Sequence, residues 1–180
     1  RYGKYENKED MEIVRGFLKK SIDIDDSLIE AKLLLGRAFL QTKDVDEALE
    51  MFKQALNQAE KFDDKKMIRD SFYSIGIYYQ IKEKYNKAIS YYDRSIKISE
   101  KIGDKNGLSK AFTAMGSVYS YPVNLNRDLN ISLDYFTRSL KILEEIGDNK
   151  EQISMLQKLG FINIQKCNID LALDYYNRAF

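Results

Sequence analysis

The feature that most constrains this sequence is an internal repeat marked by glycine. Gly36, Gly76, Gly116 and Gly160 are separated by 40, 40 and 44 residues. An aromatic residue follows three positions after the first three glycines, and a small residue, an aromatic and another small residue follow at offsets of 12, 16 and 19. The Gly116 unit shows the series once a four-residue insertion is allowed. The recurring residues are Phe39, Tyr79 and Tyr119; Ala48, Ala88, Ser132 and Ala172; Phe52, Tyr92, Phe136 and Tyr176; and Ala55, Ser95, Ser139 and Ala179. A chain with this period builds stacked supersecondary units.

Each half of a unit has the periodicity of an amphipathic helix. In the second unit, apolar and small residues lie on one helical face, namely Ala88, Ile89, Tyr92, Ser95 and Ile96. One proline and nine glycines in 180 residues favour long helices with short turns. The sequence predicts helices over 1–7 (partial), 10–23, 27–41, 44–61, 65–81, 84–102, 105–121, 128–146, 149–166 and 169–180.

The repeated glycines are expected inside helices, where glycine costs roughly 1 kcal/mol relative to alanine. Their recurrence therefore indicates close packing. We expect Gly76 and Ala88 to let two antiparallel helices touch backbone to backbone, with Tyr79 and Tyr92 filling the space beside them. The insertion falls in 121–126, which contains the single proline, and predicts a longer turn.

Glycine, aromatic, alanine, aromatic and alanine at these offsets resemble the signature of tetratricopeptide (TPR) repeats. The stretches 100–105 and 144–149, with 61–65 as a variant, resemble the subclass with repeats of roughly 40 residues. In these stretches glycine is expected to end one helix and aspartate to cap the next, at Gly103 and Asp104 and at Gly147 and Asp148.

The resemblance implies an all-α, right-handed superhelical solenoid of antiparallel helix pairs. It also implies a single TPR domain over 1–180. The expected units are a partial repeat 1–26, repeats 27–64 and 65–104, a repeat 105–148 with the insertion near 121–126, and a C-terminally truncated repeat 149–180.

In TPR solenoids, the first helix of each repeat lines a concave partner-binding face. Carried over position by position, the resemblance implies a groove formed by Leu33, Arg37, Leu40, Tyr73, Ile77, Gln80, Ile81, Lys110, Tyr121, Gln157, Phe161 and Ile164. These positions are more apolar than a solvated face requires. Two explanations are open: a protein or peptide binds there, or a neighbouring repeat, an N-terminal helix or a second copy of the chain covers them.

Composition argues against several other partners. Lys and Arg total 29 against 28 Asp and Glu, which gives no basic face for nucleic acid and no polybasic signal for anionic membranes. No apolar stretch approaches the ~20 residues of a membrane-spanning helix, so no membrane insertion is expected. The single Cys167 cannot form an internal disulfide, which fits a reducing, cytoplasmic location.

No residue pattern points to catalysis, a cofactor or a metal. The chain has no histidine and no glycine-rich phosphate-binding motif. The acidic pairs Asp25–Asp26 and Asp63–Asp64 lie at expected turns, where aspartate caps helices. Cys167 has no histidine to activate it, and a structural role is expected. The tyrosines occupy core positions of the repeat rather than a stacking platform for single-stranded nucleic acid.

These observations favour a non-catalytic protein–protein interaction scaffold. The alternative is a regulatory or self-association segment of a larger bacterial signalling protein, because 9–36 resembles the TPR region attached to some bacterial nucleotide cyclases and kinases. The chain starts without methionine and ends inside an expected helix, so we interpret it as part of a longer protein. Pairing through the solenoid ends is expected for such a fragment.

Overall fold

The computed structural model describes the backbone of residues 8–179 and the side chains of residues 10–179. Within this range all regular elements are α-helices. They are α1 (Lys8–Ile24), α2 (Ile29–Gln41), α3 (Val45–Lys61), α4 (Lys65–Ile81), α5 (Tyr85–Ile102), α6 (Lys105–Ser120), α7 (Leu129–Ile146), α8 (Asn149–Gln165) and α9 (Ile169–Ala179). The nine helices confirm those predicted over the same segments, and every boundary lies within two residues of its prediction. The partial helix expected over 1–7 lies outside the described residues.

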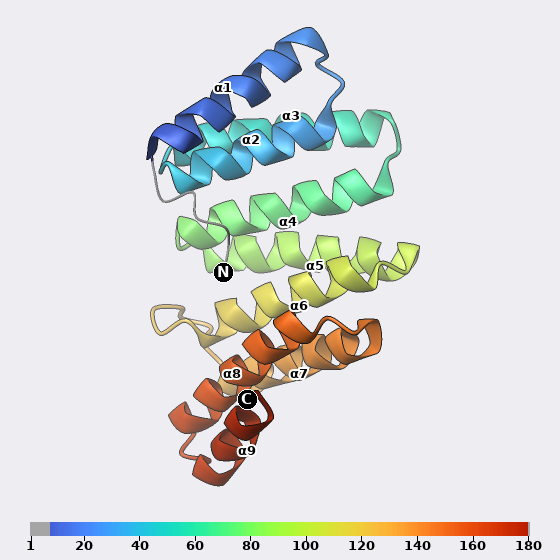
Figure 1. Ribbon diagram of the computed structural model, residues 1–180. Coiled ribbons are helices and arrows are strands. Elements are labelled where there is room, and N and C mark those ends of the chain that lie inside the picture. Colours follow the sequence, from blue (N-terminus) through green and yellow to red (C-terminus); the bar gives the residue numbers. More distant parts are fainter. Residues whose placement is uncertain (1–7, 180) are drawn as a thin grey trace.

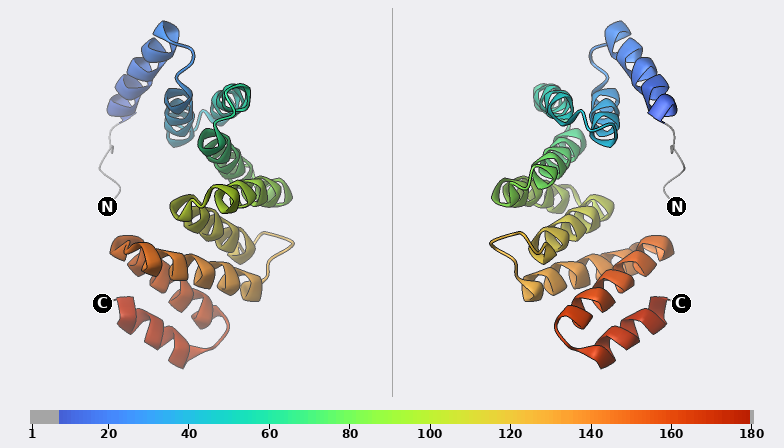
Figure 2. Two further views of the ribbon diagram at one scale, coloured as in Figure 1. Left: turned by 90° about the vertical axis from the view of Figure 1, so that its right-hand side faces the viewer. Right: turned by 90° about the vertical axis from the view of Figure 1, so that its left-hand side faces the viewer.

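The helices pack as a linear stack of antiparallel pairs. The pairs α2–α3, α4–α5, α6–α7 and α8–α9 follow one another from one end of the molecule to the other, and α1 packs against α2 (Figure 1). The two side views show successive pairs turning about the long axis (Figure 2). The chain is therefore an all-α solenoid, as predicted. Its buried residues form three clusters along the stack, around Phe52, Tyr92 and Phe136.

The repeated glycines make room for aromatic rings. A Cβ atom at Gly76 would lie 2.5 Å from the Tyr92 ring, and one at Gly116 would lie 2.6 Å from the Phe136 ring. The predicted close approach is confirmed, but the group that contacts the glycine is a ring and not the backbone of the facing helix. Tyr79, expected beside this contact, stacks on Tyr91 with 5.4 Å between ring centroids. The cost of a helical glycine is thus offset by full burial of an aromatic side chain.

The helix caps follow the prediction. Gly103 and Gly147 end α5 and α7 in the left-handed conformation, with φ of 68° and 73°. Asp104 accepts a hydrogen bond from the Gly107 amide at the start of α6, and Asp148 accepts one from the Glu151 amide in α8. These bonds satisfy amides that the first helical turn leaves unpaired.

The longer turn expected near 121–126 is present between α6 and α7. Asn124 is buried and donates a hydrogen bond to the Val118 carbonyl, 2.9 Å away. Asn126 donates to Asn86 on α5, and Arg127 donates to the Gln165 side chain on α8 at 2.6 Å. The insertion is therefore an anchored loop attached to two other helix pairs. Among the described helices, none is long and apolar enough to cross a membrane.

Candidate functional site

A continuous groove runs over α4, α6 and α8. Two adjoining hollows form it, one of about 270 Å³ and one of about 450 Å³, and both are lined by Gln80, Ser117 and Tyr121. We call this surface the central groove. Its other lining residues are Tyr73, Ile77, Ile81, Tyr92, Thr113 and Ala114 in the smaller hollow, and Ser120, Phe136, Ser154, Gln157, Lys158, Phe161 and Ile162 in the larger one. Three successive repeats thus contribute to one surface.

The chemistry of the central groove is apolar and polar but almost uncharged. Lys158 is the one ionisable lysine, arginine or carboxylate group among its lining residues. Ile81 and Phe161 expose 49% and 56% of their surface, which is more than a packing role requires. Thr113 and Ser117 donate hydrogen bonds to carbonyls of their own helix, and Thr113 Oγ1 also lies 2.9 Å from the Ser139 hydroxyl oxygen. Such a lining suits a neutral ligand.

Tyr92 lies directly beneath the groove and is fully buried. Its hydroxyl donates to the Gln80 side-chain oxygen at 2.7 Å, which fixes the orientation of that amide. Burial raises the pKa of Tyr92 far above its ordinary value, so the phenol stays protonated and remains a donor. Tyr92 and Phe136 are 0% and 2% exposed, so both belong to the core, as the sequence predicts, and they support the groove from beneath.

The structure brings seven of the twelve predicted groove residues together. These are Tyr73, Ile77, Gln80, Ile81, Tyr121, Gln157 and Phe161. Ile164 lies on α8 one turn beyond Phe161 and is 46% exposed, although it lines neither hollow. Leu40 is half-buried and packs on the core around Phe52. Leu33 is a correction: it is 2% exposed and belongs to that core, so it has no surface to offer a partner.

Arg37 and Lys110 form a charged border instead of joining the central groove. Both are exposed, and their charges act on Asp70 of α4. Burial raises the pKa of the Asp70 carboxyl, and the nearby Arg69, Arg37 and Lys110 charges lower it in part. Apart from Lys158, the groove is therefore uncharged along its length, and it carries mixed charge at this one border.

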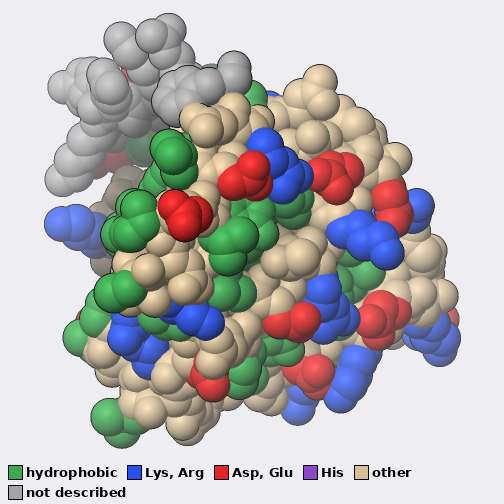
Figure 3. All heavy atoms as spheres, turned by 90° about the horizontal axis from the view of Figure 1, so that it is seen from below, with side chains coloured by type: hydrophobic (Ala, Val, Ile, Leu, Met, Phe, Trp, Pro, Cys, Tyr) green, Lys and Arg blue, Asp and Glu red, His purple; other side chains and the backbone are tan. Residues whose placement is uncertain are grey.

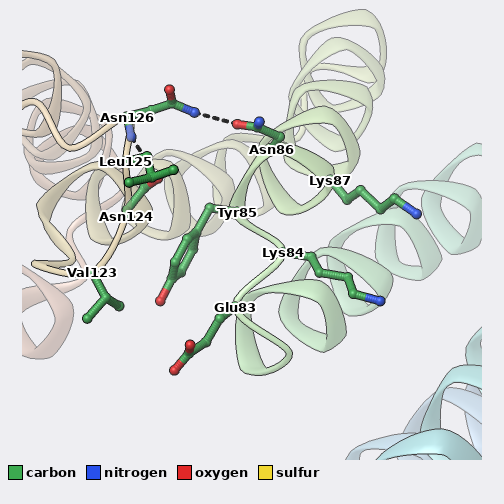
Figure 4. A pocket seen from close by; sticks show the side chains of 9 residues that line it. All are labelled: Glu83, Lys84, Tyr85, Asn86, Lys87, Val123, Asn124, Leu125 and Asn126. Atoms are coloured by element: carbon green, nitrogen blue, oxygen red, sulfur yellow. Dashed lines mark hydrogen bonds between the residues drawn. The ribbon is translucent and has the colours of Figure 1, made fainter.

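The insertion loop extends the apolar surface beside the central groove. The rings of Tyr121 and Tyr85 lie 5.9 Å apart and join the loop to α5. Next to them, a hollow of about 310 Å³ lies between the start of α5 and the loop (Figure 4). Val123 and Leu125 lie on its loop side and are 64% and 101% exposed.

A second apolar surface lies at the α9 end of the stack. Ile169 and Leu173 are 61% and 58% exposed. Their counterparts at the same repeat offsets, Tyr85 and Ile89 of α5, are buried and half-buried against α6. Seen from this end, apolar side chains gather toward one side of the surface, and acidic and basic side chains alternate over the other (Figure 3).

The acidic pairs and the cysteine lie in turns. Asp25 accepts hydrogen bonds from Ser27, and Asp64 caps α4 through the Met67 amide. Within residues 10–179, no group of three His, Cys, Asp or Glu side chains is arranged to hold a metal ion. Cys167 is exposed in the α8–α9 turn with φ of 61°.

Comparison with known sequences identifies the repeat. The profile of the tetratricopeptide repeat matches residues 33–66, and a second profile of the same description matches residues 70–102. The chain is 30% identical over 93 residues to tetratricopeptide repeat protein 29 of Macaca fascicularis, a match covering 52% of this chain. It is 28% identical over 90 residues, 50% of this chain, to the chloroplastic protein FLUORESCENT IN BLUE LIGHT of Arabidopsis thaliana. These matches span 20% and 28% of the relatives' own lengths.

Solved structures share the fold at low sequence identity. BtubC from P. vanneervenii superimposes with a TM-score of 0.77 over 95% of this chain and 70% of its own, at 15% identity. The signal transduction ATPase PH0952 from Pyrococcus horikoshii, described as having a tetratricopeptide repeat sensor, gives 0.76 over 93% of this chain and 24% of its own, at 19% identity. The repeat profiles, the glycine–ring packing and the stacked helix pairs agree that this chain carries tetratricopeptide repeats, which the profiles locate at residues 33–66 and 70–102.

Proposed function

We propose that this chain is a non-catalytic protein-interaction scaffold that binds a peptide or helix of another protein in the central groove. The observation that carries the proposal is the continuity of the groove across α4, α6 and α8, with Ile81 and Phe161 exposed along it. Apolar side chains kept accessible in a concave surface are typical of binding sites. Tetratricopeptide repeats form extended concave binding surfaces, and their presence supports the same function.

The lining defines the chemistry of the partner segment. A groove with hydroxyl and amide groups and Lys158 as its one charged side chain favours apolar side chains alternating with uncharged polar ones, because most buried charges would find no opposite charge there. An amphipathic helix laid on its apolar face, or an extended apolar peptide, meets this requirement. Affinity should then change little with salt, unlike binding that depends on exposed ion pairs.

A capture experiment tests the groove. The chain is immobilised, and proteins retained from a lysate are compared with those retained by the variant Ile81→Glu with Phe161→Glu. Both side chains are exposed, so the fold should persist, and a groove ligand should lose at least about tenfold in affinity. The matched control is Ile131→Glu, which changes an exposed apolar side chain on α7 outside the groove. Equal retention by all three proteins would contradict groove binding.

The alternative, a regulatory or self-association segment of a signalling protein, is favoured by a different surface. Ile169 and Leu173 of α9 are exposed where the corresponding side chains of α5 are covered by the next helix. The resemblance of 9–36 to repeats attached to bacterial cyclases and kinases, and the sensor repeats of the similar ATPase, are in keeping with it. Sedimentation of the chain and of its Leu173→Lys variant separates the two functions: a dimer that the variant dissociates supports self-association, and a monomer throughout supports the scaffold.

A further inference from the structure

One unit departs from the others at two linked positions of its second helix. At offsets of 15 and 18 from the repeated glycine, three units have tyrosine and arginine once the insertion is allowed: Tyr91 and Arg94, Tyr135 and Arg138, and Tyr175 and Arg178. The unit of Gly36 has Met51 and Gln54 at these offsets.

The tyrosine and arginine fill a definite space in the units of Gly76 and Gly116. Tyr91 stacks on Tyr79 of the preceding helix with 5.4 Å between centroids and 19° between ring planes. The Arg94 guanidinium carbon lies 5.4 Å from the centroid of the Tyr91 ring. In the next unit Tyr135 stacks on Tyr119 at 6.0 Å and 11°, with Arg138 at 5.6 Å from the Tyr135 ring. The aromatic ring covers the first helix, and the cation covers the ring.

In the unit of Gly36 a hollow opens beside Met51 and Gln54. It has a volume of about 400 Å³ and lies between α1, α2 and α3. Phe39, at the offset of Tyr79 and Tyr119, forms its floor together with Leu35. Both side chains are otherwise buried, with 5% and 2% exposed. Methionine and glutamine thus stand where the repeat elsewhere supplies a stacked ring and a cation.

The rim of this hollow is acidic. Asp23, Glu47 and Glu50 line it, and within residues 10–179 no ion pair joins any of the three to a lysine or arginine. Lys19 is the one basic lining residue, and its ammonium lies 5.5 Å from the centroid of the Phe39 ring. The Arg15 guanidinium, which pairs with Asp44 outside the hollow, lies 4.4 Å from the same centroid. The surface therefore combines an apolar floor with net negative charge, unlike the almost uncharged central groove.

We propose that this hollow is a second binding site, which takes a protein segment presenting an aromatic side chain next to an arginine. The ring would enter the hollow beside Met51 and against the small part of Phe39 that lines it, and the guanidinium would face Glu47 and Glu50. This ligand has the chemistry that Tyr91 and Arg94 supply within the chain, and its charge complements the rim. The site shares no lining residue with the central groove, so it is independent of the function proposed for that groove.

Titration with a capped dipeptide tests the site directly. The probe is acetyl-tyrosyl-arginine amide, followed through the methyl resonances of Met51 and Leu35, with acetyl-tyrosyl-glutamate amide and acetyl-alanyl-arginine amide as matched controls. We expect saturable shifts with the first probe and at least about tenfold weaker binding of each control, because one lacks the cation and the other the ring. Equal binding of the three peptides, or no shift with the first at millimolar concentration, would overturn the proposal.

A variant whose own side chains fill the hollow provides a second test of the site. Met51→Tyr with Gln54→Arg restores the residues of the other units and should occupy the hollow. We expect it to abolish the methyl shifts caused by acetyl-tyrosyl-arginine amide and to raise the melting temperature. A variant that folds and still binds the probe as tightly as the parent would place the binding elsewhere and refute the site. The variant Glu47→Gln with Glu50→Gln keeps the hollow open but removes the negative charge of its rim. We expect it to bind acetyl-tyrosyl-arginine amide no more tightly than acetyl-tyrosyl-glutamate amide, and a retained preference for the arginine peptide would contradict the proposal.

Discussion

The guanidinium of Arg69 on α4 forms an ion pair with the carboxylate of Asp104, with 2.6 Å between Nη2 and Oδ2. The Arg69 side chain is 7% exposed, and its Nη1 also lies 2.8 Å from Asp70. Gly107 makes room for it, because a Cβ atom there would lie 2.7 Å from Nη1. Since Asp104 caps α6, the pair ties the first helix of one repeat to the first helix of the next.

Replacing Arg69 should destabilise the chain more than replacing an exposed cation. Arg69→Ala removes the charge that compensates Asp104 and leaves a gap, and we expect the free energy of unfolding to fall by about 3 kcal/mol. Lys97→Ala breaks the exposed i,i+4 pair with Asp93 and should cost no more than about 0.5 kcal/mol. Urea unfolding of the three proteins measures both changes, and equal losses would contradict a structural role for the buried pair.

The glycine–ring contact predicts opposite effects at two helical glycines. Gly76→Ala places a methyl group 2.5 Å from the Tyr92 ring and should destabilise the chain by about 1–3 kcal/mol. Gly16 lies within α1, and a Cβ atom there would meet no neighbouring group of the described residues within 4 Å, so Gly16→Ala should stabilise the chain by up to about 1 kcal/mol. Thermal unfolding monitored by circular dichroism reports both. Stabilisation by Gly76→Ala would show that the ring can move aside without cost.

Two serines at the same repeat offset should respond differently to alanine. Ser139 donates a hydrogen bond to the Ser109 carbonyl at 2.9 Å, whereas the buried Ser95 hydroxyl has no hydrogen-bond partner in the described part of the chain. Ser139→Ala should therefore cost about 1 kcal/mol, and Ser95→Ala should be neutral or stabilising by a similar amount. Chemical denaturation of both variants tests this. A larger loss for Ser95→Ala would indicate a partner for that hydroxyl, such as an ordered water.

Two aspartates should give opposite pH dependences of stability. Burial raises the pKa of Asp70 above its ordinary 3.8, so its contribution to folding is present below that pH and is lost as the pH rises through the raised value. Lys82, by hydrogen bond and charge, and Tyr78 lower the pKa of Asp46, whose contribution is present above pH 3.8 and is lost as the pH falls through the lowered value.

The measurement compares the parent with each Asp→Asn variant by urea unfolding between about pH 3 and 7. The advantage of the parent over Asp70→Asn should shrink as the pH rises, and its advantage over Asp46→Asn should grow. Slopes of the same sign for both variants would contradict the assigned environments.

Local rules in the sequence predicted the helices and their ends. The glycine period, the amphipathic spacing and the capping residues Gly103 and Asp104 act over a few residues, so the chain encodes them directly. The left-handed turn residues Lys43 and Glu83, with φ of 67° and 55°, were not predicted because neither is glycine or asparagine. Their conformation is imposed by the hydrogen bonds that close the turn after each first helix.

Side-chain burial depends on distant residues and was harder to predict. Lys32 is 2% exposed, and its ammonium lies 2.6 Å from Asp26 in the preceding turn and 2.9 Å from Gln58 on α3, a contact that the sequence does not reveal. Leu33 was assigned to the groove from its repeat offset, yet at this end of the stack it packs into the core. The repeat offset of a residue determines the helix face on which it lies. Packing of the neighbouring repeat determines whether that face is exposed to solvent.

The anchored loop between α6 and α7 has a mechanical consequence. Through Asn126 and Arg127 it holds α5 and α8 as well as its own pair, and so spans three consecutive helix pairs and the two joints between them. It acts as a brace along one edge, stiffening the stretch that carries the central groove. If the two ends of the stack are pulled apart, the helix contacts around α1 and α2, which no such loop bridges, should separate first. The central groove should keep its shape while they do.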